Sequence, residues 1–194
     1  MTRIAVLFES HAGATAALAA ALAEGVAEAG GTATLARIAP LPGDPALFGP
    51  PGPVPDLPEA TPAMLAEADG LALGTPVHFG APGAATLAFL AATGRMWMSR
   101  ALGGKPATVF TGAGSGGGAE AAVLTLWSAL ASHGMILLPG QPHAATAGPG
   151  LAAGGGPFGA GRLAGAGAEM RDVETARARA QGTALAQLAA RLKG

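Results

Sequence analysis

Short runs of β-favouring residues alternate with Ala- and Leu-rich runs along most of the chain, and this alternation constrains the fold more than any other feature. Strands that are separated by helical segments pair in parallel, because each crossover helix returns the chain to the same edge of the sheet. Helices then cover both faces, so the strands are buried and consist of continuous apolar residues. The pattern therefore predicts an α/β fold with a parallel sheet between two helical layers.

The boundaries of the predicted elements follow from these runs. Thr61 is a good N-cap residue, and Pro62 suits the first helical position, where its missing N–H costs no hydrogen bond. Five strands are predicted, over residues 3–8, 32–38, 70–73, 106–110 and 135–138. Helices are predicted over residues 15–29, from Thr61-Pro62 onward, and over 82–92, 119–132 and 171–192.

Two segments interrupt the alternation. Residues 39–60 are rich in proline, and residues 139–169 are mostly Gly, Ala and Pro. Long stretches of this kind are usually functional loops, interface elements or disordered segments. Since 194 residues suit one domain with a full core, we predict a single domain over residues 1–194 with extended loops at 39–60 and 139–169.

Composition excludes several classes of partner and site. The net charge of −1 leaves no basic footprint, so neither nucleic acid nor an anionic membrane is expected to bind. The absence of cysteine excludes disulfides and thiol chemistry, and no His or carboxylate pair has metal-ligand spacing, so no metal site is expected. The apolar run 4–8 is too short for a signal-peptide core of about 7–15 residues, which indicates a cytoplasmic protein.

The first predicted strand leads into a loop of small residues, 9–15, that continues directly into a helix. Backbone N–H groups at a helix N-terminus attract phosphate, and the hydroxyl groups of Ser10 and Thr15 can complete its shell. An ordinary N-cap turn explains the same residues equally well. No lysine or arginine lies in the loop, so the helix dipole and hydrogen bonds would have to hold the anion alone.

The third and fourth predicted strands also end in loops that suit a ligand. Residues 74–80 form a turn after an apolar run, and residues 111–120 are rich in glycine, which lets backbone approach a flat ligand closely. Gly112, Gly114 and Gly117 formally match the dinucleotide fingerprint. That fingerprint, however, belongs to the first strand of its unit and needs an acidic residue about 20 positions later, where this chain is apolar.

A doubly wound sheet of strand order 2-1-3-4-5 would bring these three loops together. In such a sheet the carboxyl ends of strands 1, 3 and 4 converge at one crevice, where ligands bind. A phosphate at the first loop and a planar ring between the other two loops describe a site for flavin mononucleotide (FMN).

The motif Ser10-x-x-Gly13-x-Thr15 resembles the phosphate loop of flavodoxin-like proteins. Nearly the whole chain is similar to the WrbA family of NAD(P)H:quinone oxidoreductases. The matching stretches are Gly74-Thr75-Pro76 with Phe79-Gly80, Thr93-Gly94 with Trp97, Gly114-x-Gly116-Gly117-Gly118-x-Glu120, His133-Gly134-Met135, residues 155–165 and residues 178–182. They include the long loop that plain flavodoxins lack.

The resemblance implies a flavodoxin-like fold and an FMN-dependent enzyme. Hydride would pass from NADH or NADPH to the flavin and then, in a two-electron ping-pong reaction, to a quinone in the same pocket. The family is tetrameric, which implies a homotetramer with sites where subunits meet. The cofactor-binding residues implied are Ser10, His11, Ala12, Gly13, Ala14, Thr15, Pro76, Val77, His78, Phe79, Gly80, Thr111, Gly112, Ala113, Gly114, Ser115, Gly116 and Gly117.

Two further residues are expected at the substrate. The resemblance implies that Trp97 stacks on the substrate and that His133, the expected catalytic residue, binds or protonates the quinone oxygen. His133 also has a structural interpretation, since an imidazole near a helix C-terminus favours the helix dipole. The chain has no evident nucleophile or carboxylate pair, which fits a reaction whose difficult chemistry belongs to the flavin.

Three departures from the family keep alternatives open. Ala12 replaces an aromatic residue, Ala14 replaces a histidine, and His78 stands where an arginine is common. An arginine there would carry a fixed positive charge that stabilises an anionic reduced flavin. His78 gives this stabilisation only when it is protonated. The alternatives are an electron-carrier flavodoxin, disfavoured by the net charge of −1, and a flavin-free flavodoxin-like scaffold. The choice between NADH and NADPH and the identity of the quinone stay open.

Overall fold

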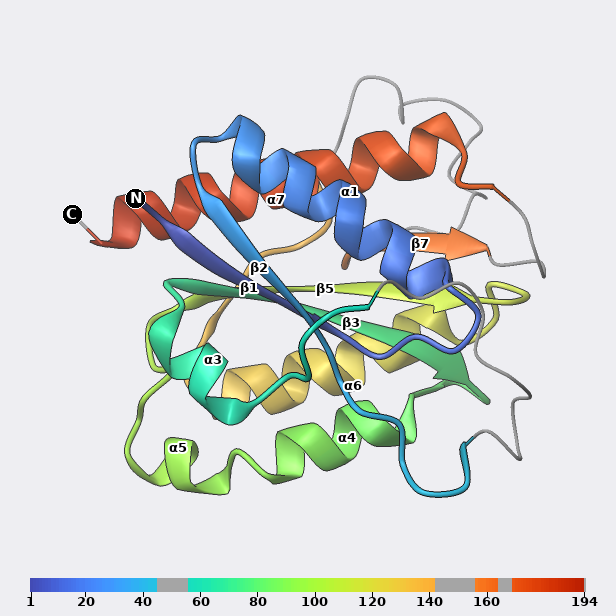
Figure 1. The fold of residues 1–194 in the computed structure, drawn as a ribbon, viewed down its shortest axis with the longest axis horizontal. Coiled ribbons are helices and arrows are strands. Elements are labelled where there is room, and N and C mark those ends of the chain that lie inside the picture. Colours follow the sequence, from blue (N-terminus) through green and yellow to red (C-terminus); the bar gives the residue numbers. More distant parts are fainter. Residues whose placement is uncertain (45–55, 142–155, 164–168, 194) are drawn as a thin grey trace.

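The computed structural model describes residues 1–44, 56–141, 156–163 and 169–193, and it contains a central parallel sheet (Figure 1). The sheet has the order β2-β1-β3-β5-β6. These strands are β1 (Arg3–Phe8), β2 (Thr32–Arg37), β3 (Gly70–His78), β5 (Pro106–Ala113) and β6 (Ile136–Leu137). They are the five predicted strands in the predicted order 2-1-3-4-5, so the doubly wound flavodoxin-like fold is confirmed.

The two central strands are longer than the sequence predicts. β3 continues to His78 and β5 to Ala113, because Thr75 pairs with Thr111 and Pro76 with Gly112 beyond the apolar cores of both strands. A short strand, β4 (Ala81–Pro82), then turns back antiparallel onto the end of β3. The first residues of both predicted loops are therefore strand ends, which fixes their backbone.

One further strand lies inside a segment that the sequence predicts to be a loop. β7 (Ala160–Leu163) pairs parallel with the end of β5, so the prediction of an extended loop over 139–169 was wrong there. Its start is fixed by the buried amide of Gln181, whose Oε1 accepts a hydrogen bond from Ala160 N at 2.6 Å and whose Nε2 donates to the Val109 carbonyl at 3.0 Å. Residues 45–55, 142–155 and 164–168 of the two predicted loops lie outside the described residues.

Helices cover both faces of the sheet, as predicted (Figure 1). Side chains alternate along β1, so that Val6 packs under one helical layer and Leu7 under the other. One layer contains α1 (Ala14–Glu28) and α7 (Asp172–Lys193); the other contains α3 (Pro62–Glu67), α4 (Ala84–Ala91) and α6 (Ala119–Ser132), with α5 (Gly94–Met98) after α4. Of these helices, all within the described residues, only α5 was not predicted. No helix in the described ranges is both long and apolar enough to cross a membrane.

Candidate functional site

The loops that follow β1, β3 and β5 meet at the carboxyl edge of the sheet. β3 pairs with β1 on one side and β5 on the other, so the three strand ends are neighbours. The loops after β3 and β5 touch through glycines: a Cβ added at Gly118 would overlap the Cα of Gly80, and both residues have positive φ. Only glycine permits both this backbone conformation and this close approach. The sequence prediction that these loops converge is confirmed.

The loop after β1 gathers hydrogen-bond donors at the N-terminus of α1. Gly13 is the N-cap residue with φ of 87°, and the Oγ of Ser10 accepts a hydrogen bond from the N–H of Ala16 at 3.4 Å. A Cβ at Gly112 of β5 would lie 3.0 Å from the Oγ1 of Thr15, so β5 closes over the first turn of the helix. Backbone N–H groups and two hydroxyl groups therefore surround this helix end, a donor set that fits a phosphate.

Phe79 is the most exposed aromatic side chain of the described residues. Its relative exposure is 109%, and its backbone lies in the left-handed region with φ of 53°. That conformation costs a non-glycine residue about 1 kcal/mol, and such strain concentrates at ligand sites. An unburied aromatic ring beside glycine loops offers a surface on which a flat ring system can stack. The N-terminus of α1 thus suits the phosphate of FMN, and Phe79 with the glycine loops suits its flat ring system.

The charged groups beneath the loops form a partly buried cluster. Glu9 is buried, and its Oε2 accepts hydrogen bonds from the N–H and the Oγ1 of Thr86 at 2.8 and 2.7 Å. Its Oε1 lies 2.9 Å from the Nε2 of His11, whose ring centroid is 5.4 Å from that of His78. Sequence reasoning missed Glu9 and Thr86 as parts of the site, although an acidic residue that ends a buried strand was a usable signal.

The surroundings of His78 lower the pKa of its imidazole. Burial lowers the pKa of His78, and the nearby His11 lowers it further, against the opposing effect of Glu9 and of Asp44. A lowered pKa disfavours the positively charged form of His78, at the position where the resemblance implies an arginine.

All the residues predicted to bind the cofactor lie at this edge of the sheet or in its three loops. Ala14 and Thr15 form the first turn of α1, while Pro76, Val77 and His78 end β3. Ser10, His11, Ala12 and Gly13 form the first loop and Phe79 with Gly80 the second; Thr111, Gly112 and Ala113 end β5, and Gly114, Ser115, Gly116 and Gly117 follow it.

Trp97 and His133 lie elsewhere, at the opposite edge. The loop after β5 leads into α6, whose 14 residues span about 21 Å and end beside His133. Next to His133, the carbonyl of Gly134 accepts a hydrogen bond from Gly104, just before β5 begins. The Nε1 of Trp97 donates to the Ser132 carbonyl at 2.9 Å, so Trp97 and His133 do lie together. They line an open pocket of about 520 Å³ that contains none of the predicted cofactor residues.

The hydrogen bonds of His133 define its tautomer. The Oγ1 of Thr93 donates to the Leu90 carbonyl at 2.6 Å, so the contact of 2.9 Å to His133 requires a donating Nε2–H. The Nδ1 of His133 is then an acceptor, and it is buried without a partner among the described residues. Burial also lowers the pKa of His133. In this tautomer Nδ1 carries no proton, so it can accept but not donate a hydrogen bond.

Comparison with known protein families identifies the family of this chain. Residues 2–149 match the family described as NADPH-dependent FMN reductase. The chain belongs to this family. Members of the family are FMN-dependent oxidoreductases, which agrees with the phosphate donors and the exposed aromatic ring at the carboxyl edge.

Solved structures share the fold over the full length. A flavodoxin, WrbA-like protein from Agrobacterium tumefaciens is 22% identical, with 98% of this chain and 99% of that chain covered and a TM-score of 0.68. A flavodoxin from the domain Archaea is 16% identical over 100% of both chains, with a TM-score of 0.65. An oxidoreductase from Corynebacterium diphtheriae is 21% identical over 98% of both chains, with a TM-score of 0.62. At these identities the likeness supports the fold alone.

Proposed function

We propose that this protein is an FMN-dependent NAD(P)H:quinone oxidoreductase whose cofactor lies across the three loops of the carboxyl edge. One observation carries the proposal: the donor-rich N-terminus of α1, the exposed ring of Phe79 and the touching glycine loops all lie at the ends of adjacent strands. Family membership supports the cofactor and the nicotinamide substrate. The quinone rests on the resemblance of the sequence to the WrbA family.

The residues of the chain would bind and orient the cofactor. The first-turn N–H groups of α1, with the hydroxyls of Ser10 and Thr15, would hold the phosphate, and Phe79 would pack against the ring system. Backbone groups after Gly112 would approach the edge of the ring, which glycine permits. When bound, FMN supplies the two-electron redox chemistry, so the chain needs no nucleophile.

We propose that the substrate side of the site comes from a neighbouring copy in a homotetramer. Within one chain, Trp97 and His133 lie at the far edge of the sheet, so they can contact a cofactor at the loops only across a subunit boundary. Trp97 is 58% exposed and Met98 78% exposed, which suits an apolar interface. His133 would support this interface rather than touch the substrate, because its Nε2 contacts the Oγ1 of Thr93 and its Nδ1 is buried.

Reconstitution with FMN followed by steady-state kinetics tests this function. We expect FMN-dependent oxidation of NADPH or NADH with benzoquinone, and slower turnover after Ser10→Ala. Thr125→Ala is a matched control, since Thr125 is an exposed hydroxyl on α6 that bonds only its own helix. No oxidation by the FMN-loaded protein would refute the proposal.

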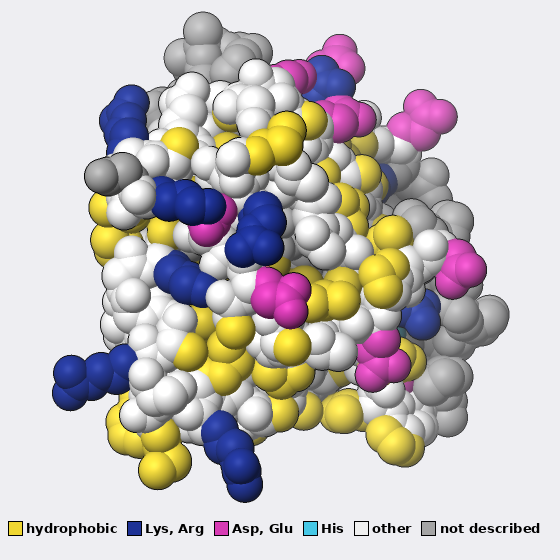
Figure 2. Space-filling view, turned by 60° about the vertical axis from the view of Figure 1, so that its left-hand side comes forward, with side chains coloured by type: hydrophobic (Ala, Val, Ile, Leu, Met, Phe, Trp, Pro, Cys, Tyr) yellow, Lys and Arg dark blue, Asp and Glu magenta, His cyan; other side chains and the backbone are white. Residues whose placement is uncertain are grey.

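A one-electron carrier would give a different result. It would bind FMN yet be reduced only slowly by free NADPH in a rapid-mixing experiment. Carriers of this kind usually present a strongly acidic surface. On the face shown in Figure 2, acidic and basic side chains are scattered between apolar ones, and neither sign forms a continuous patch.

A further inference from the structure

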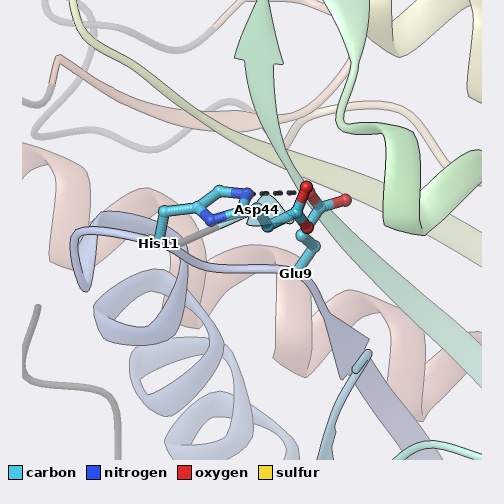
Figure 3. Close-up of side chains that lie close together, drawn as sticks. All are labelled: Glu9, His11 and Asp44. Atoms are coloured by element: carbon cyan, nitrogen blue, oxygen red, sulfur yellow. Dashed lines mark hydrogen bonds and ion pairs between the residues drawn. The ribbon is translucent and has the colours of Figure 1, made fainter. Parts of the chain in front are cut away.

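The cluster under the first loop contains the side chains that a metal ion requires. One ligand atom from each of Glu9, His11 and Asp44 lies within 4.8 Å of the other two, and Figure 3 shows the three side chains converging. Spacing along the sequence did not reveal this set, since Asp44 comes from the proline-rich segment after β2. We propose that Glu9, His11 and Asp44 bind a divalent transition-metal ion such as Zn²⁺.

The dimensions of the cluster suit such an ion. Zinc–ligand bonds of 2.0–2.2 Å in a tetrahedral site place neighbouring ligand atoms about 3.3 Å apart. The 2.9 Å between the Nε2 of His11 and the Oε1 of Glu9 therefore needs only a small adjustment.

The carboxylates are oriented by the protein around them. The Oε2 of Glu9 is held by the N–H and hydroxyl of Thr86, which leaves Oε1 directed at His11. One oxygen of Asp44, Oδ2, accepts a hydrogen bond from the N–H of Leu41 at 2.7 Å. Hydrogen bonds of this kind fix the orientation of metal ligands and raise the affinity of a site.

Charge balance also favours a cation. Glu9 is 2% exposed and Asp44 is 7% exposed, so two carboxylates are largely removed from water within a few ångströms of each other. Buried charges of like sign are costly unless they are compensated. A divalent ion with two carboxylates and one neutral imidazole gives a neutral site. Imidazole nitrogen favours zinc and its neighbours in the periodic table over Mg²⁺ and Ca²⁺, which prefer oxygen.

Calorimetric titration of the chelator-treated full-length protein with Zn²⁺ tests the proposal. We expect one equivalent to bind with or without FMN and with millimolar Mg²⁺ present. Glu9→Gln, His11→Gln and Asp44→Asn keep a hydrogen-bonding group at each position, and each should weaken binding at least about 10-fold. His133→Gln, which removes a partly buried histidine outside the cluster, should leave the Zn²⁺ affinity unchanged.

Two results would overturn the metal site. One is the absence of saturable Zn²⁺ binding to the wild type; the other is an equal affinity in the three ligand variants. Circular dichroism checks the folding of each variant. Should the carboxylate variants not fold, His11→Gln decides the question, because the His11 side chain is partly exposed. Binding of FMN is recorded separately, so a failed metal site and a failed flavin site are distinguishable results.

Discussion

Replacement of Phe79 by glycine should weaken FMN binding and leave the stability of the fold nearly unchanged. The Phe79 side chain is 109% exposed, so its removal loses no packing within the chain. Its φ of 53° costs a non-glycine residue about 1 kcal/mol, which glycine recovers. Glycine also gives the unfolded chain more freedom, at a cost of about 0.4–1 kcal/mol. The two effects nearly cancel, so the free energy of unfolding of the apoprotein should change by less than about 0.5 kcal/mol.

The same change should weaken FMN binding. An aromatic pair contributes about 0.5–1.5 kcal/mol beyond the area that it buries, which corresponds to a roughly 2- to 12-fold higher dissociation constant for Phe79→Gly. Phe79→Tyr is the matched control, since it keeps the ring and the backbone conformation. Urea unfolding of the apoprotein and fluorescence titration with FMN measure the two quantities.

The result that refutes this reasoning is specific. It is a loss of more than 1 kcal/mol of apoprotein stability in Phe79→Gly, with the FMN affinity unchanged. Phe79 would then pack within the protein in solution and would not contact the flavin.

Three further predictions concern the scaffold. Gln181→Leu removes the buried amide that joins α7 to β5 and β7, and should lower the unfolding free energy by about 3 kcal/mol in urea denaturation. Gly182→Ala places a Cβ against a carbonyl oxygen of α1, and thermal unfolding should show a loss of about 1–3 kcal/mol. Burial raises the pKa of Asp69, but hydrogen bonds from the N–H of Arg3 and from Lys193 outweigh it and leave that pKa below 3.8. Wild type should therefore be more stable than Asp69→Asn above pH 3.8, and this advantage should be lost as the pH falls through the lowered pKa of Asp69. Urea unfolding at a series of pH values measures the difference.

Local pattern predicted the sheet well, because each buried strand is a continuous apolar run. The order 2-1-3-4-5 and the boundaries of β1 and α6 agree with the structure. β7 was missed since Ala160-Gly161-Arg162-Leu163 has little β-propensity and is held by a distant side chain, Gln181. No local pattern can report a hydrogen bond between residues that far apart.

The candidate site was predictable only in part. Glycines and hydroxyls at strand ends follow from sequence, so the loops at Ser10 and Gly112 could be assigned. The pairing of Glu9 with Thr86 and its approach to Asp44 depend on tertiary packing across more than one layer. The position of His133, at the far end of α6, follows from helix length and could have been read from the sequence.

The central claim is that the carboxyl edge of this sheet binds FMN through the N-terminus of α1, and an FMN titration tests it most directly. We expect the apoprotein to bind one FMN per chain, and riboflavin, which lacks the phosphate, to bind at least about 10-fold more weakly. Ser10→Ala should weaken FMN binding and leave riboflavin affinity unchanged. No saturable FMN binding, or equal affinity for FMN and riboflavin, would contradict the account.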